Sequence, residues 1–169
     1  MYPTELRTLI PAENIQKRVR EMGRQISDDY REQTIHVLAV LENAFVFTAD
    51  LVRTLDVPLV CQFVKPQYRP GDVLEIFFSH GPDISGQHVL LLEGLVHSGL
   101  TTDFLMSDVR SRGAASVKVA TLLDRPVARR VQLQPDYFGF LVQEPFVVGY
   151  GLGSAQQTNR NLPYLAVAS

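Results

Sequence analysis

Apolar residues recur at helical spacing near the start of the chain, with charged residues between them. From Pro11 to Arg31 they lie three or four positions apart, which predicts an amphipathic helix with one apolar stripe. The positions in this stripe are Ile15, Val19, Met22, Ile26 and Tyr30. A second, shorter helical pattern is formed by Ala44, Phe47, Leu51 and Leu55.

Short apolar blocks of strand length separate and follow these helices. They lie at 35–41, 59–64, 73–78, 88–92, 116–123, 137–141, 146–150 and 164–167. Prolines and a glycine between Lys65 and Asp72 predict a turn-rich break. A third helix is expected from Thr101 to Arg112. Strands that are apolar on both faces and alternate with helices indicate an α/β fold with a central, largely parallel sheet. We expect one domain over residues 1–169, with a small β-rich part towards the C-terminus.

Composition narrows the class of protein. The 169 residues are 46% hydrophobic, enough for one buried core, and the formal net charge is -2. No long block of lysine or arginine suggests a nucleic-acid surface, and no apolar run reaches the ~18 residues that span a bilayer. The single cysteine, Cys61, is expected to be a buried strand thiol. Because Met1 to Pro11 does not look like a signal peptide either, the expected location is the cytoplasm.

The end of the block at 88–92 carries the clearest chemical pattern. Glu93 and Gly94 follow the block, and the segment His97-Ser98-Gly99-Leu100-Thr101 leads into the third helix. Small residues before a helix present backbone N–H groups and hydroxyls to an anion, and ligands of α/β folds bind at the carboxyl ends of strands. On the residues alone, an ordinary helix cap is the alternative interpretation.

This segment resembles the phosphoribosyl-pyrophosphate motif of type I phosphoribosyltransferases. Further matches to the hypoxanthine-guanine subgroup, in its order and spacing, lie at 15–30, 45–55, 117–125, 136–140, 146–152 and 160–164. The resemblance implies the type I phosphoribosyltransferase fold. It also implies a reaction in which hypoxanthine or guanine displaces pyrophosphate from phosphoribosyl pyrophosphate, giving IMP or GMP, with Mg²⁺ as cofactor and a homodimer or homotetramer as the assembly.

The resemblance also implies roles for individual residues. Those expected around the 5′-phosphate are His97, Ser98, Gly99, Leu100 and Thr101. Those expected at the purine are Arg125, in place of the usual lysine, Phe146, which would stack on the base, and Val147, whose backbone would contact it. Leu41, Glu42 and Arg160 would lie on the pyrophosphate side, and Glu93 and His97 would take part in catalysis. Core packing is the alternative for Phe146.

Several positions depart from the pattern of the subgroup, and each departure weakens the catalytic machinery. Gly94 replaces one carboxylate of an acidic pair, and His97 replaces the aspartate that handles the purine N7 proton. Gly153 replaces a metal-binding aspartate, which matters because Mg²⁺ prefers oxygen ligands. Glu42 would repel pyrophosphate if its side chain pointed inward. The path from Phe63 to Ile76 is also too short for the mobile lid of the subgroup.

Two hypotheses follow from these departures. In the first, the chain retains a pocket for a purine nucleoside monophosphate, GMP or IMP, but is catalytically weak or inactive, with Glu93 as a weak metal ligand. In the second, it is a working purine-salvage enzyme that uses Mg²⁺, with neutral His97 as the base. His36, His80 and His88 have no paired ligand spacing and are expected to be structural or solvated.

Overall fold

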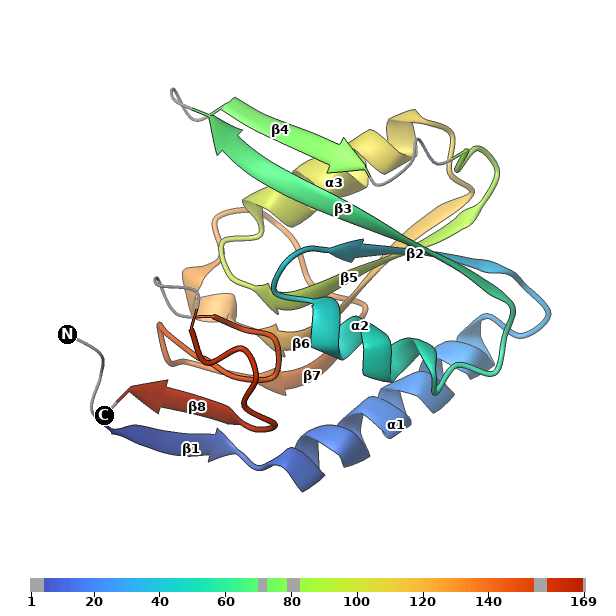
Figure 1. The fold of residues 1–169 in the computed structure, drawn as a ribbon. Coiled ribbons are helices and arrows are strands. Elements are labelled where there is room, and N and C mark those ends of the chain that lie inside the picture. Colours follow the sequence, from blue (N-terminus) through green and yellow to red (C-terminus); the bar gives the residue numbers. More distant parts are fainter. Residues whose placement is uncertain (1–4, 70–72, 79–82, 154–157, 169) are drawn as a thin grey trace.

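A six-stranded sheet with the order β4-β3-β2-β5-β6-β7 forms the centre of the molecule (Figure 1). The structure, a computed structural model, describes residues 5–69, 73–78, 83–153 and 158–168. The strands are β2 (Ile35–Val40), β3 (Leu59–Arg69), β4 (Val73–Phe78), β5 (His88–Val96), β6 (Ser116–Asp124) and β7 (Tyr137–Leu141). All neighbours run parallel except β3 and β4, which are antiparallel. The expected α/β fold with a largely parallel sheet is confirmed.

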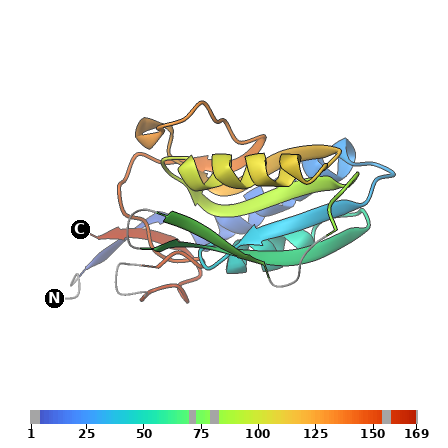
Figure 2. The ribbon, with the colours of Figure 1, turned by 90° about the horizontal axis from the view of Figure 1, so that it is seen from above.

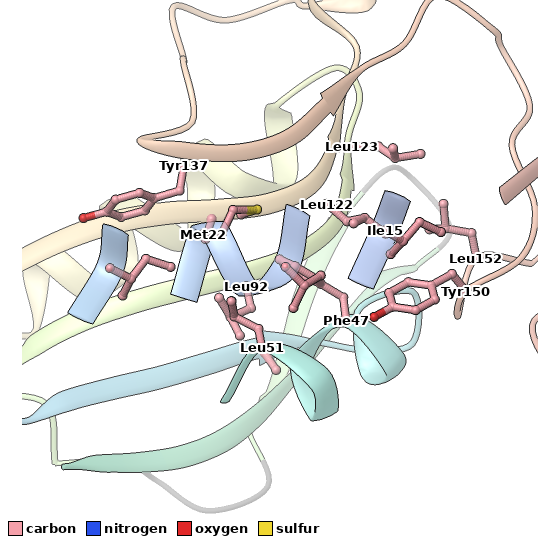
Figure 3. Close-up of a cluster of buried hydrophobic side chains, with 14 of the residues drawn as sticks. Ile15, Met22, Phe47, Leu51, Leu92, Leu122, Leu123, Tyr137, Tyr150 and Leu152 are labelled. Atoms are coloured by element: carbon pink, nitrogen blue, oxygen red, sulfur yellow. The ribbon is translucent and has the colours of Figure 1, made fainter. Parts of the chain in front are cut away.

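Helices cover both faces of this sheet, which explains why its strands are apolar on both sides. α1 (Ala12–Asp29) and α2 (Phe45–Val52) bury one face, and α3 (Leu100–Ser111), yellow in Figure 2, buries the other. Side chains alternate between the faces along a strand. Leu92 of β5 accordingly packs with the stripe of α1 and with Phe47 (Figure 3), whereas its neighbour Leu91 packs with Leu105 of α3. A short 3₁₀ helix, η1 (Pro126–Ala128), follows β6.

The first and the last strand in the sequence pair with each other. β1 (Leu6–Ile10) and β8 (Leu165–Ala168) form a separate antiparallel ribbon, with Leu6 opposite Ala168. Figure 1 shows this ribbon at the end of the molecule towards which β2 and β5 point. The sequence did not predict β1, because most of its residues are half-buried or exposed and form no apolar block.

Two local predictions were wrong. The expected strand at 146–150 is irregular and makes only isolated bridges, because Gly149 and Gly151 have φ values of 97° and 92°, which extended backbone does not allow. The expected break between Lys65 and Asp72 is wrong in its first part, because β3 runs through Pro66 to Arg69, and its remaining residues, 70–72, lie outside the described part of the chain. Beyond Val64, β3 pairs with β4 alone, and a proline is tolerated where one side of a strand is open.

The part of the chain that the structure describes contains no helix that is both long and apolar enough to cross a membrane.

Candidate functional site

The candidate site lies where three neighbouring parallel strands end. β2, β5 and β6 end at Val40, Val96 and Asp124, so the residues that follow them meet at one edge of the sheet. A cleft of about 200 Å³ is located there. It is lined by Val40, Leu41, Asn43, Pro66, Glu93, Leu95, His97, Ser98, Gly99, Thr101 and Thr102. The structure therefore brings together Glu93, Leu41 from the pyrophosphate side, and four of the five residues expected around the 5′-phosphate; Leu100 is not among the lining residues.

A tight turn precedes α3 at the expected phosphate segment. Gly99 has φ 79°, a left-handed conformation that glycine adopts without steric cost. A Cβ atom on Gly99 would lie 2.9 Å from Val131 Cγ2 and 3.0 Å from Arg129 Cδ, so the segment after β6 packs directly on the turn. The Leu100 N–H donates to Ser98 Oγ at 3.4 Å. The sequence 97–101 thus forms a compact turn at a helix N-terminus, with arginine side chains beside it.

His97 and Arg125 are in direct contact next to this turn. Arg125 Nη1 lies 2.6 Å from His97 Nε2, and Arg125 Nε donates to the Gln143 carbonyl at 3.0 Å. A guanidinium group has donors only, so His97 Nε2 must be the acceptor and the imidazole is neutral. Burial and then the charges of Arg125, Arg130 and Arg129 lower the pKa of His97, which favours the same neutral form.

Arg129 was not expected in the site, but it connects the end of β6 to the phosphate turn. It forms an ion pair with buried Asp124, and only 11% of the Arg129 side chain is exposed. Its Nη1 also donates to the carbonyl of His97 at 3.3 Å. The sequence signal was the arginine-rich segment 125–130 after the β6 block, but spacing alone does not show which arginine turns back to the phosphate turn.

Glu93 is a buried carboxyl group on β5, with 8% of its surface exposed. The Thr102 hydroxyl donates to Glu93 Oε1 at 2.7 Å. Burial raises the pKa of Glu93 to about 7, although the Thr102 hydrogen bond and the charge of Arg129 act in the opposite direction. Near neutral pH this group is therefore divided between its charged and neutral forms.

Glu42, expected to repel pyrophosphate, is instead held between two cations. Its carboxylate oxygens lie 2.8 Å from Lys65 Nζ and 3.7 Å from Arg160 Nη2. The hydrogen bond from Lys65, then its charge, and finally the charge of Arg160 lower the pKa of Glu42. Arg160 Nη1 also donates to Asn43 Oδ1 at 2.9 Å and to the Gly151 carbonyl. The predicted repulsion is consequently offset by two positive charges.

Two glycines lie where the resemblance predicts carboxylates, and a side chain at either position would meet neighbouring atoms. A Cβ atom on Gly94 would overlap the carbonyl oxygen of Asn43. A Cβ atom on Gly153 would lie 2.8 Å from Arg160 Nε and 3.0 Å from Arg160 Cζ. A side chain at position 94 would therefore overlap backbone atoms, whereas one at position 153 would require only the Arg160 side chain to move.

The described residues do not fit a protein-held Mg²⁺ site. Among them, no group of three or more histidine, cysteine, aspartate or glutamate side chains is close enough to hold a metal ion. Glu93, the expected weak ligand, is buried and hydrogen-bonded to Thr102.

The residues expected at the purine differ in exposure. Phe146 is 79% exposed, so core packing within this chain does not explain it, whereas Val147 is buried.

His36, His88 and Cys61 are not among the residues that line the cleft. His88 Nδ1 lies 2.8 Å from Ser116 Oγ, and His36 is half-buried. His80 lies outside the described residues. Cys61 is half-buried, which is less than expected.

Comparison with protein families gives one match that covers most of the chain. The family described as "Phosphoribosyl transferase domain" matches residues 8–155. This range includes the phosphate turn, Glu93 and the Arg125–His97 contact.

Individual relatives match over nearly the whole chain. The "Hypoxanthine-guanine phosphoribosyltransferase" of Bacillus subtilis is 36% identical, covering 95% of this chain and 92% of that protein. A crystal structure of a hypoxanthine-guanine phosphoribosyltransferase from Bacillus anthracis superposes with a TM-score of 0.91 at 34% identity, covering 98% of this chain and 99% of that one. The "Bifunctional protein TilS/HprT" of Listeria monocytogenes is also 36% identical over 95% of this chain, which spans only 26% of that longer protein.

Proposed function

The chain belongs to the hypoxanthine-guanine phosphoribosyltransferase family, and from this membership we propose that it is a working purine phosphoribosyltransferase. It would join hypoxanthine or guanine to phosphoribosyl pyrophosphate and release pyrophosphate. One observation carries the proposal: the phosphate turn Ser98–Thr101 is formed at the end of β5, in a chain that resembles named enzymes of this kind over nearly its full length.

Residues of the cleft and of the segments after β6 and β7 support a division of roles. The backbone and hydroxyls of Ser98, Gly99 and Thr101 bind the 5′-phosphate at the N-terminus of α3. Arg125 donates to the 6-oxygen of the purine, and exposed Phe146 stacks on the ring. His97 is neutral, as a general base must be. Its Nε2 lone pair accepts the N7 proton once Arg125 has turned from the imidazole to the base.

A second candidate function is binding of GMP or IMP with weak or no turnover. The glycines at positions 94 and 153 favour it, because the resemblance implies carboxylates there that would stabilise the transition state. A monophosphate makes no demand on those carboxylates, since it has no pyrophosphate for a metal ion to bridge.

Steady-state synthesis of IMP and GMP separates the two functions. We expect a kcat within the ordinary enzymatic range of about 1–10³ per second. The His97→Ala variant should reduce turnover by about 10²–10⁴-fold, the usual contribution of a general base, while leaving GMP binding measurable. GMP binding without product, in the parent chain, would establish the second function instead. If neither product nor GMP binding is found, both functions are excluded.

The predicted homodimer or homotetramer and the predicted cytoplasmic location both stay predictions. The resemblance also implies Mg²⁺ as a cofactor. The described residues do not provide a metal site of their own, so the proposal assigns no Mg²⁺ ligand among them.

A further inference from the structure

A hydrogen bond between Tyr150 and Asp50 joins the segment 146–152, expected at the purine, to helix α2. We propose that Asp50 and Tyr150 are positioning residues, which act on the base only through this segment. Together they hold it where Phe146 and Val147 can bind the purine. The inference rests on the proposed function, because it concerns the purine side of the same site.

The backbone around Tyr150 has an unusual conformation. Gly149, Tyr150 and Gly151 have φ values of 97°, 49° and 92°, so three consecutive residues lie in the left-handed region. Glycine adopts this region freely, but a residue with a side chain seldom does, and it persists there only where the surrounding structure holds it. The conformation of the turn 149–151 therefore depends on what Tyr150 contacts.

Tyr150 is held by both its backbone and its side chain. Its N–H donates to the Leu162 carbonyl at 2.8 Å, and its hydroxyl donates to Asp50 Oδ2. Only 3% of the tyrosine is exposed, so without Asp50 the hydroxyl would be buried and unsatisfied. Burial and then the hydrogen bond to Asp50 raise the pKa of Tyr150, which keeps the hydroxyl protonated and able to donate.

Asp50 is itself fixed by two further donors. Gln16 of α1 donates to Asp50 Oδ2 at 3.0 Å, and Arg53, at the end of α2, forms an ion pair with Oδ1. Burial alone would raise the pKa of Asp50, but the hydrogen bonds from Tyr150, Gln16 and Arg53 lower it, so the carboxylate stays charged. Tyr150 therefore donates to a charged acceptor that is joined to both helices on this face of the sheet.

The same turn lies against the start of α2, next to the cleft. A Cβ atom on Gly151 would lie 3.1 Å from the Asn43 carbonyl oxygen and 3.4 Å from Val46 Cβ. Asn43 lines the cleft, and Val46 and Asp50 are about one helical turn apart on α2. Contacts at two successive turns of α2 therefore fix the segment, and with it buried Val147, relative to the cleft.

The test compares two ligands that share a 5′-phosphate and differ in the base. Calorimetric titration of the full chain with GMP and with ribose 5-phosphate gives a ratio of Kd values that depends on the purine side alone. Tyr150→Phe removes the hydroxyl and retains the ring. It should weaken GMP binding by at least about threefold, and by no more than the roughly 150-fold effect of a full hydrogen bond to a charged group. Ribose 5-phosphate binding should stay within about twofold of the parent.

Two variants separate positioning from a general loss of structure. Asp50→Asn retains an oxygen that can accept from Tyr150 and Gln16, so it should bind GMP within about threefold of the parent. Tyr137→Phe is the matched control, because Tyr137 is also 3% exposed and donates to an aspartate, Asp29, at 2.6 Å. Tyr137 lies at the opposite end of the buried core from Tyr150 (Figure 3). Tyr137→Phe should lower the melting temperature about as much as Tyr150→Phe does, but leave the binding of both ligands unchanged.

The outcomes distinguish this inference from the proposed function. If Tyr150→Phe binds GMP like the parent, or weakens GMP and ribose 5-phosphate equally, the inference is overturned, while synthesis of IMP by the parent still supports the proposed function. If the parent binds GMP without making product, the proposed function fails, but the expected change in the Kd ratio still supports the inference. If one of the two ligands does not bind the parent chain, the inference is overturned as well, and the synthesis of IMP and GMP alone decides the proposed function.

Discussion

At the scale of single residues, the buried carboxyl of Glu93 should make folding stability depend on pH. Its pKa is about 7 in the folded chain, compared with an ordinary value of 4.5. Between these pH values the folded chain retains a proton that the unfolded chain releases, so the free energy of unfolding falls as pH rises and levels off above about 7. We predict that Glu93→Gln is more stable than the parent by roughly 3 kcal/mol at pH 8 and about equally stable near pH 4.5.

Chemical denaturation across this pH range checks the prediction. The glutamine retains an oxygen acceptor for Thr102 without adding a charge, so lost packing should contribute little. Glu32→Gln, at an exposed position, serves as the control and should follow the parent at every pH. Equal pH slopes for Glu93→Gln and the control would mean that the buried charge does not govern stability.

The residue scale also marks a limit of sequence analysis. The motif identified Glu93 and His97 as site residues, and the structure places both in one cleft. Neutral His97 was part of the second hypothesis, but the physical causes of both protonation states were not predictable, because they are burial and partners brought close by folding. His97 is neutral because Arg125, 28 positions away in sequence, donates to its ring. The structural role of Arg129 was hidden for the same reason.

At the scale of elements, the turn before α3 should tolerate no side chain at Gly99. Alanine there is strained by a left-handed φ of 79° and also crowded by Val131 and Arg129. Gly86 is the matched control, since it has a similar φ of 70° but nothing within 4 Å of a Cβ atom. We predict that both alanine variants lose about 1–2 kcal/mol from backbone strain, and that Gly99→Ala loses more and also weakens GMP binding.

Thermal unfolding and GMP titration of the two variants test this account of the turn. Similar melting temperatures and similar GMP affinities for Gly86→Ala and Gly99→Ala would show that strain alone matters, and that the packing of the segment after β6 on the turn does not.

Elements determined by their own residues were predictable from the sequence. Elements determined by a partner strand or by backbone conformation were not. The stripe of α1 and the apolar block of β5 arise from residues within each element, and both were found where the pattern indicated. The continuation of β3 through Pro66 depends on β4, a partner that the residues of β3 cannot specify. The irregular 146–150 segment depends on two glycine φ values that its apolar composition conceals.

At the scale of the whole molecule, one sheet with helices on both faces positions the cleft. The ends of β2, β5 and β6 meet there only because these strands are neighbours and parallel, although they are far apart in sequence. Parallel topology was predictable from strands that are apolar on both faces. The pairing of β1 with β8 was not, since the two strands lie at opposite ends of the chain.

That pairing makes the fold a candidate for circular permutation. Because Leu6 lies opposite Ala168, a short linker could join these two residues, and closing a short loop costs little conformational entropy. The chain could then be reopened in the exposed turn between Glu32 and Gln33. We predict that such a permutant unfolds in one cooperative transition and binds GMP like the parent, whereas a permutant opened at buried Leu91 does not fold. If the first permutant fails as well, the linear order in which the strands leave the ribosome, and not only their pairing, is needed to reach this structure.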